Sequence, residues 1–272
     1  MSAQTEPRPV PALPLDSGPL ALPRTQVLGI PLAVSDYERV MAWMDEVVRT
    51  RARVCVTAAA VHLVMVARED PETRRAIEHA LVVPDGVPLV WALRALGRRE
   101  ATRVYGPDLM ANYCARSART GGTMYLYGGR SDAALQQLTD RLLARFPGLR
   151  IVGGWSPPFR ELSDVELDEV AERINATGAD VVWVGTGQPK QEKWMARMRD
   201  RLDAPILAGV GAAFDFHADI VPQAPAWMQR SGLEWSYRLA REPTRLWRRY
   251  ARYNPRFVAA FVRQYAAHRA AR

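Results

Sequence analysis

Short apolar runs alternate with longer segments of helical periodicity along most of the chain. Six runs keep this rhythm: VCVTAA (54–59), LVVPDG (81–86), TMYLYGG (123–129), RIVGGW (150–155), DVVWVGTG (180–187) and PILAGVG (205–211). Strands separated by helices are typical of parallel βαβ units. We therefore predict an α/β fold, a Rossmann-like and mostly parallel sheet of about six strands with helices on both faces.

The two ends of the chain differ from this pattern. Residues 1–24 hold six prolines and lack the continuous apolar core of a signal peptide, which predicts a disordered tail. The α/β domain is predicted to span 25–227. Its longest nearly apolar stretch, 54–67, is too short for the roughly 20 residues of a spanning helix. Two cysteines suggest neither a disulfide framework nor a zinc site and favour a reducing, cytoplasmic setting.

The positive charge gathers at the C-terminal end. The chain carries +8, but residues 228–272 hold eleven arginines, no lysine and two glutamates, which gives +9 and leaves −1 for residues 1–227. Aromatic residues such as Phe257 and Phe261, four apart, form an apolar stripe beside this cationic one. A basic amphipathic helix of this kind suits an anionic membrane surface. The alternative is a helix that packs on the domain or on a sister subunit.

One carboxylate stands where a buried strand turns into a helix. In VVPDGVPLVW, Asp85 follows a run of valines and precedes an apolar helical segment. The side chain of Asp85 is expected either to cap that helix or to serve as an active-site acid, because α/β sheets bind ligands at the carboxyl ends of their strands. Local sequence leaves both interpretations open.

Glycines and polar residues crowd the ends of three later strands. Glycines at such ends let the backbone approach a ligand, and the next helix N-terminus favours an anion such as phosphate. No complete dinucleotide or P-loop motif is present. The predicted binding residues at these ends are Gly128, Gly129, Gly185, Gly187, Lys190, Gln191, Glu192 and Gly211.

Arg103, in RVYGPDL, can present its guanidinium to a diphosphate, although a surface role is the alternative.

His62 is isolated on an apolar run, and no second His or Cys stands at metal-ligand spacing. Asp-x-Asp after a strand, which would hold a divalent metal, is also missing. We expect no metal and no cofactor, so arginines and helix dipoles would stabilise a departing diphosphate.

The order of these motifs resembles one family, the WecG/TagA/CpsF glycosyltransferases. The matching stretches are VPDGVPLVW (83–91), RVYGPDL (103–109), YLYGG (125–129), FPGLRIVG (146–153), VGTGQPKQEKW (184–194), GVGAAFDF (209–216), QAPAWMQRSGLEWSYRL (223–239) and EPTRLWRRY (242–250). The resemblance implies an inverting, metal-independent transfer from a UDP-sugar to a polyprenyl-diphosphate-linked sugar in surface-polysaccharide synthesis. This reaction would take place at the cytoplasmic face of the membrane.

The resemblance also implies roles for single residues. Asp85 matches the family's general base, and Thr57, Arg103 and Gln191 match positions of its active site. Three arginines of a C-terminal, membrane-associating appendage, here 228–272, are implied to close over the diphosphate: Arg238, Arg245 and Arg248.

One departure concerns specificity. Many relatives have T-x-N where this chain reads Thr57-Ala58-Ala59, so Ala59 replaces an asparagine and the donor or acceptor sugar can differ.

The competing class is a nucleic-acid-binding protein that uses the Arg and aromatic tail, but the basic excess is confined to that tail, so we expect no nucleic acid partner. A non-catalytic assembly factor would be expected to lack Asp85 and Arg103. The sequence leaves a homo-oligomer open.

Overall fold

The computed structural model describes residues 20–270 apart from the side chain of Arg245; most of the predicted 1–24 tail therefore lies outside the described residues. The described part contains one sheet of eight strands in the order β1-β2-β4-β3-β8-β7-β5-β6. These are β1 (Arg24–Val27), β2 (Ile30–Ala33), β3 (Val54–Ala59), β4 (Ala80–Pro84), β5 (Thr123–Gly128), β6 (Arg150–Trp155), β7 (Val181–Gly185) and β8 (Ile206–Gly209). All neighbours are parallel except β1 and β2.

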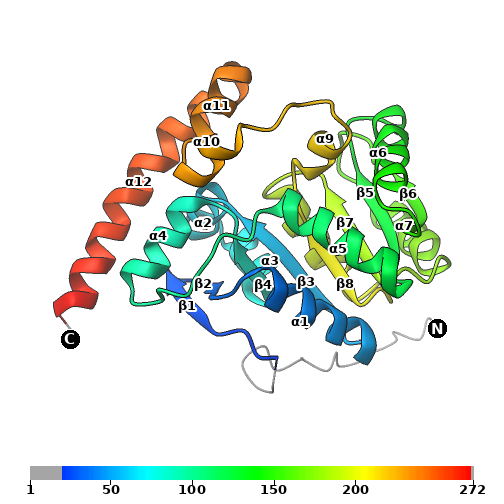
Figure 1. Cartoon of the computed structure of the whole chain (residues 1–272), viewed down its shortest axis with the longest axis horizontal. Coiled ribbons are helices and arrows are strands. Elements are labelled where there is room, and N and C mark those ends of the chain that lie inside the picture. Colours follow the sequence, from blue (N-terminus) through cyan, green and yellow to red (C-terminus); the bar gives the residue numbers. More distant parts are fainter. Residues whose placement is uncertain (1–19, 271–272) are drawn as a thin grey trace.

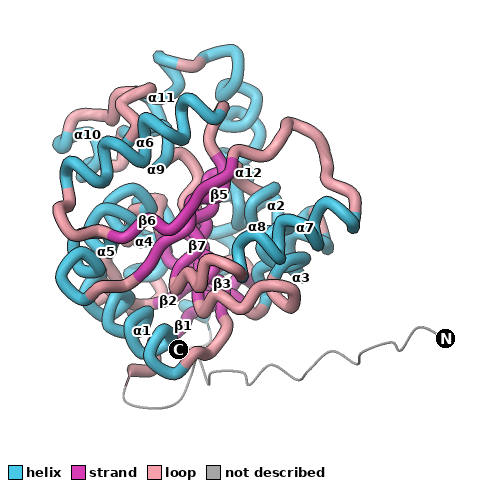
Figure 2. The backbone as a smooth tube through the Cα atoms, turned by 90° about the vertical axis from the view of Figure 1, so that its right-hand side faces the viewer, coloured by secondary structure: helices cyan, strands magenta, loops and turns pink. Residues whose placement is uncertain are grey.

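Helices cover both faces of the sheet, as predicted (Figure 1). They are α1 (Tyr37–Thr50), α2 (Val61–Glu69), α3 (Pro71–Glu78), α4 (Val87–Ala95), α5 (Gly106–Thr120), α6 (Asp132–Arg145), α7 (Asp164–Asn175), α8 (Lys190–Met198), α9 (Ala213–His217), α10 (Ala226–Ser231), α11 (Glu234–Arg241) and α12 (Pro243–Ala270). Figure 2 shows the strands running between the two helical layers.

Alternation along the strands builds two cores. On β3, Cys55 and Ala59 face the core formed with α2, α3, α4, α7, α8 and α12, whereas Val54 and Val56 face the core formed with α1, α5, α6 and α9. Both faces of the central strands are therefore buried, which explains why they read as continuous apolar runs in the sequence.

The prediction of about six strands missed a hairpin at the N-terminal edge. β1 and β2 have four residues each, and the two residues between them, Leu28 and Gly29, have positive φ angles of 54° and 83°. Two successive positive φ angles are typical of the tight turns that match strand twist. No helix separates these two strands, so the alternation of apolar runs with helical segments, on which the prediction rests, does not reveal them.

The chain reverses its direction of sheet growth after β4. It then crosses to β5, and β7 and β8 later fill the space between β5 and β3. Ligands of open α/β sheets bind at the carboxyl ends of the strands beside such a switch point. The ends of β3, β4, β7 and β8 are therefore where a site is expected.

The long helix α12 packs along the domain on its way from α11 to the N-terminal hairpin (Figure 1). Phe257 is only 5% exposed and Phe261 packs against the same core, so this part of the predicted stripe faces inward. Arg252 and Arg256 both pair with Glu69 of α2, at 2.7 and 3.0 Å. None of the described helices is both long and apolar enough to cross a bilayer.

Candidate active site at the ends of the central strands

Asp85 lies directly after β4, and it does not cap the helix that follows. The N-cap of α4 is Gly86, which has no side chain, so no side chain caps this helix. The Asp85 Oδ2 atom instead accepts a hydrogen bond from the backbone N–H of Gly106, at 3.2 Å. Gly106 is the first residue of α5, and first-turn N–H groups lack partners inside their own helix. The carboxylate is therefore held at the N-terminus of a helix that follows later in the chain.

Arg103 connects Asp85 to the C-terminal helices. Its Nε donates to the Asp85 carbonyl at 2.5 Å, and its Nη2 lies 3.3 Å from Asp85 Oδ1. The same Nη2 donates to Glu234 Oε2 at 2.5 Å, while Nη1 donates to the Gln229 carbonyl at 3.4 Å. The guanidinium also lies 4.0 Å from the ring centroid of Tyr105, whose hydroxyl donates to Glu234 Oε1 at 3.0 Å. One nitrogen of Arg103 thus contacts two carboxylates, Asp85 of the α/β domain and Glu234 of α11.

This environment changes the acidity of Asp85. Burial raises the pKa of its carboxyl to about 6, Arg103 opposes that effect, and the nearby Glu234 carboxylate adds to it. The side chain is 19% exposed. A carboxylate of this pKa is ionised at neutral pH yet accepts a proton more readily than an ordinary aspartate, which suits a general base.

A second polar cluster joins the ends of β3, β7 and β8. Thr57 Oγ1 donates to Glu192 Oε1 at 2.6 Å, and Gln191 Nε2 donates to the same oxygen at 2.8 Å. Gln191 Oε1 accepts from the N–H of Gly211 at 3.0 Å. Thr57, Gln191 and Glu192 are fully buried, and burial raises the pKa of Glu192. The cluster fixes the strand ends to α8, whose first residue, Lys190, is exposed.

The glycines predicted at the ends of β5 and β7 are closely packed. A Cβ at Gly128 would lie 2.8 Å from the backbone of Gly185, and one at Gly185 would lie 2.5 Å from the ring of Phe214 in α9. Packing by itself is enough to require glycine at both positions. Gly129 and Gly187, with φ angles of 103° and 83°, meet no such contact and turn the chain away from the strands.

A cleft of about 110 Å³ opens between the end of β4 and the C-terminal helices. Its charged lining comes from both sides: Asp85, Arg103, Glu234, Arg238 and Arg249. His62 and the rings of Trp235, Tyr250 and Tyr253 form much of the remaining wall. Burial lowers the pKa of His62 to about 3, so this side chain is neutral at physiological pH. Among the described residues, no group of three or more His, Cys, Asp or Glu side chains could hold a metal ion.

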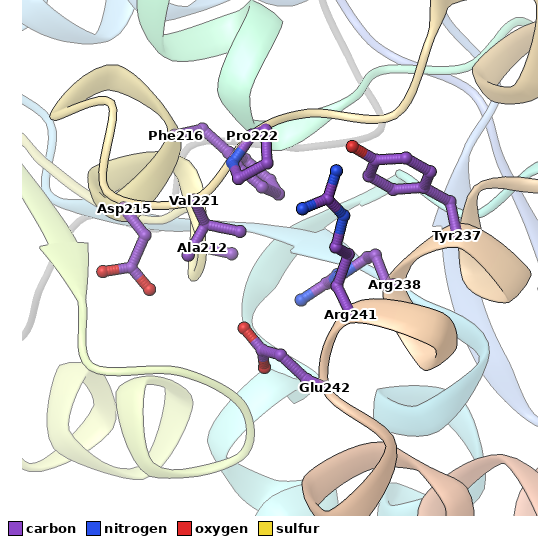
Figure 3. Close-up of a pocket in the computed structure, with 9 residues that line it drawn as sticks. All are labelled: Ala212, Asp215, Phe216, Val221, Pro222, Tyr237, Arg238, Arg241 and Glu242. Carbon is purple, nitrogen blue, oxygen red and sulfur yellow. The ribbon is translucent and has the colours of Figure 1, made fainter.

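Figure 3 shows a smaller pocket where α11 faces the loop that contains α9. Its walls include Arg238, which also lines the larger cleft and lies 5.8 Å from the ring centroid of Phe216. Asp215, another wall residue, accepts two hydrogen bonds of 2.9 Å from Arg130, which lies 3.9 Å from Glu242. Arg238 therefore stands between the two hollows.

The three arginines predicted to close over a diphosphate have different positions. Arg238 lines the cleft. Arg248 is exposed, with its guanidinium 5.4 Å from the ring centroid of Trp247, and Arg249 is the residue of that pair that lines the cleft. Arg245 belongs to α12, and its side chain lies outside the described part.

Sequence reasoning did not single out Glu234, Tyr105 or Arg249. The available signal for Glu234 was its charge, since it is one of two glutamates in a block with eleven arginines. Tyr105 lies inside the RVYGPDL motif, but a tyrosine there is equally compatible with packing. For Arg249 no signal distinguished it from its neighbour Arg248.

Comparison with known proteins places the chain in a family. Residues 25–271 match the glycosyl transferase WecG/TagA/CpsF family. A protein of Bacillus spizizenii, named N-acetylglucosaminyldiphosphoundecaprenol N-acetyl-beta-D-mannosaminyltransferase, is 28% identical over 198 residues, which cover 72% of this chain and 74% of that protein. A protein of the same name from Bacillus subtilis is 30% identical over 168 residues, covering 62% of this chain and 63% of that protein. The chain thus belongs to the WecG/TagA/CpsF family and is a hexosyltransferase.

Proposed function

We propose that the protein transfers a sugar from a UDP-sugar to a polyprenyl-diphosphate-linked sugar in the synthesis of a bacterial surface polysaccharide. The names of both Bacillus relatives describe an N-acetylmannosaminyltransferase that acts on N-acetylglucosaminyldiphosphoundecaprenol. The observation that carries the proposal is the Asp85 carboxylate, which reaches the cleft beside Arg103 with its pKa raised to about 6.

In the proposed reaction Asp85 acts as the general base. Its carboxylate takes the proton of the acceptor hydroxyl while the hydroxyl oxygen forms a bond to C1 of the donor sugar. The bond between C1 and the UDP oxygen breaks, and its electron pair leaves with UDP. Attack from the face opposite the leaving group inverts the configuration at C1, so a single displacement needs one carboxylate.

Arginines replace a metal ion in this proposal. Arg103, Arg238 and Arg249 line the cleft and supply positive charge to the diphosphate groups of donor and acceptor. The guanidinium fork matches phosphate oxygens in geometry as well as charge. We therefore expect transfer to need no divalent cation.

We assign the donor to the edge formed by β5, β7 and β8. Gly129, Gly187 and Gly211 lie one or two residues beyond the ends of these neighbouring strands, and a helix N-terminus, which favours phosphate, follows each of them. Thr57 and Gln191 both donate to Glu192 Oε1, and Gln191 accepts from the Gly211 N–H, so this buried cluster fixes the loop after β8. Ala59 is fully buried. Its methyl group also cannot form the hydrogen bonds that the asparagine of many relatives could form with a sugar.

The C-terminal helices are proposed to hold the enzyme against the cytoplasmic face of the membrane. Trp227, Trp235 and Trp247 are 58%, 42% and 52% exposed. Exposed tryptophans beside arginines suit the headgroup region of an anionic bilayer. Replacing Trp247 by Ala should weaken co-sedimentation with anionic vesicles while transfer to a short-chain, water-soluble acceptor continues unchanged.

A donor screen tests the proposed function. The protein would be incubated with a panel of UDP-sugars and N-acetylglucosaminyl diphosphate linked to a short polyprenyl chain, and UDP release would be measured. We expect one donor to give UDP and a disaccharide product whose new linkage has the inverted anomeric configuration by NMR. The nucleic-acid alternative predicts no UDP release and salt-sensitive binding of single strands instead.

A further inference from the structure

Three charged side chains meet beneath α11, and only two of them belong to the residues expected at the site. Asp85 and Arg103 come from the ends of neighbouring segments of the α/β domain, and Glu234 is the first residue of α11. Their side chains are 19%, 19% and 11% exposed. An acid at this depth would be unfavourable without its own partners, and Glu234 has two, Arg103 and Tyr105.

The geometry divides the Arg103 guanidinium unequally between the two carboxylates. Its Nη2 atom is 2.5 Å from Glu234 Oε2 but 3.3 Å from Asp85 Oδ1. The short contact therefore goes to Glu234, and the carboxylate of Asp85 keeps only a long one. Tyr105, which donates to Glu234 Oε1 at 3.0 Å, holds Glu234 in this position.

We propose that Glu234 is a positioning residue of the transfer reaction, which draws the Arg103 guanidinium toward α11 and so keeps Asp85 free to accept the acceptor's proton. This inference rests on the proposed function, in which Asp85 is the base. Glu234 touches no reacting atom and acts through Arg103. It also makes formation of an active base depend on the docking of α11.

Electrostatics supports the geometry. An arginine fully paired with Asp85 would lower its pKa and weaken it as a base, whereas a second carboxylate nearby raises the pKa. Titratable or charged groups face Asp85 from all the elements packed around it. They are Tyr37 from α1, His62 from α2, Arg103 and Tyr105 from the segment before α5, Glu234 and Arg238 from α11, and Arg249 from α12. Of these groups, Glu234 is the only carboxyl group.

The test is a direct titration of the Asp85 carboxyl carbon by ¹³C NMR in the full-length protein, assigned by its absence in Asp85→Asn. In Glu234→Gln, a negative neighbour is lost and Arg103 is released toward Asp85, so both changes act in the same direction. We expect Asp85 to titrate about one pH unit lower than in the wild type. An unchanged or higher titration midpoint would overturn the proposal.

Kinetics supply the second readout. On the soluble acceptor, Glu234→Gln should move the acidic limb of kcat/KM to lower pH by the same amount and reduce the plateau roughly three- to tenfold, because the base is weaker. Glu234→Asp, which restores the charge, should return the limb toward its wild-type position. A lower rate with an unmoved limb in both variants would mean that Glu234 serves only to dock α11.

Glu242→Gln is the matched control. Glu242 is the other glutamate of the C-terminal block; it faces Arg130 at 3.9 Å and lines the smaller pocket rather than the cleft of Asp85. Its substitution removes the same charge and should leave the Asp85 titration in place. If wild-type protein transfers no sugar from any donor, the proposed function fails, while the NMR titration still decides whether Glu234 controls Asp85.

Discussion

Two carboxylates lie at the ends of the central strands, and their surroundings give them different roles. Asp85 and Glu192 both have pKa values raised by burial. Asp85 lines a cleft, with Arg103 beside it, whereas Glu192 is fully enclosed and receives side-chain hydrogen bonds from the neutral groups of Thr57 and Gln191. A raised pKa alone therefore does not mark a catalytic acid or base. What distinguishes Asp85 is its access to a ligand and its direct contact with Arg103, at 3.3 Å.

The largest loss of turnover should come from removing the charge of Asp85. Asp85→Asn should lower turnover by about 10²–10⁴-fold, because a general base is lost, and leave UDP binding nearly intact. The wild-type kcat/KM should fall as the pH drops below about 6, where Asp85 takes up a proton, and the variant should lack this limb. Steady-state kinetics and calorimetric UDP titration measure both effects. Retention of more than about half of the activity would assign the base elsewhere.

The arginines of the appendage provide the next contrast. Arg238→Ala should reduce transfer to a soluble acceptor about tenfold or more, because Arg238 lines the cleft. Arg248→Ala should leave that reaction within about twofold, since Arg248 is exposed and contacts Trp247. Equal losses in the two variants would contradict this arrangement of α11 and α12.

Glu192 should respond to shape more than to charge. Glu192→Ala leaves Thr57 and Gln191 without their shared acceptor and opens a cavity, so the free energy of unfolding should fall by about 2–4 kcal/mol. Glu192→Gln keeps the acceptor oxygen and should change that free energy by less than about 1 kcal/mol at neutral pH, with most of the activity retained. Urea denaturation followed by tryptophan fluorescence measures both.

The pH dependence of stability checks the same difference. The folded-state pKa of Glu192 is raised, so the native protein binds this proton more tightly than the unfolded chain does. The resulting contribution is fully present below the unfolded pKa, near 4.5, and is lost as pH rises through the folded value. Glu192→Gln should therefore flatten the stability profile above pH 4.5. A profile identical to wild type would mean that Glu192 is ionised in the fold.

The smallest effect is expected from chelation. Excess EDTA should leave transfer unchanged, because arginines rather than a cation are assigned to the diphosphates. Activity lost on chelation and restored by magnesium or manganese would instead show that a divalent cation takes part in the transfer.

The sequence by itself determined the layered α/β fold, the six strands β3 to β8 and the position of Asp85 at a strand end. These depend on the order and periodicity of neighbouring residues, which a linear pattern records. It did not determine β1 and β2, which form a hairpin with no helix between them and so fall outside the strand–helix alternation.

Only the tertiary structure decided which side chains meet at the site. Arg103 and Glu234 are 131 positions apart, and no local pattern relates residues at such a separation. On α12, successive residues point about 100° apart, so the packing of the whole helix decides that Arg249 enters the cleft while Arg248 does not. The same packing turns Phe257 inward and leaves Trp247 exposed. An amphipathic sequence defines the two faces of a helix, but its neighbours determine what each face contacts.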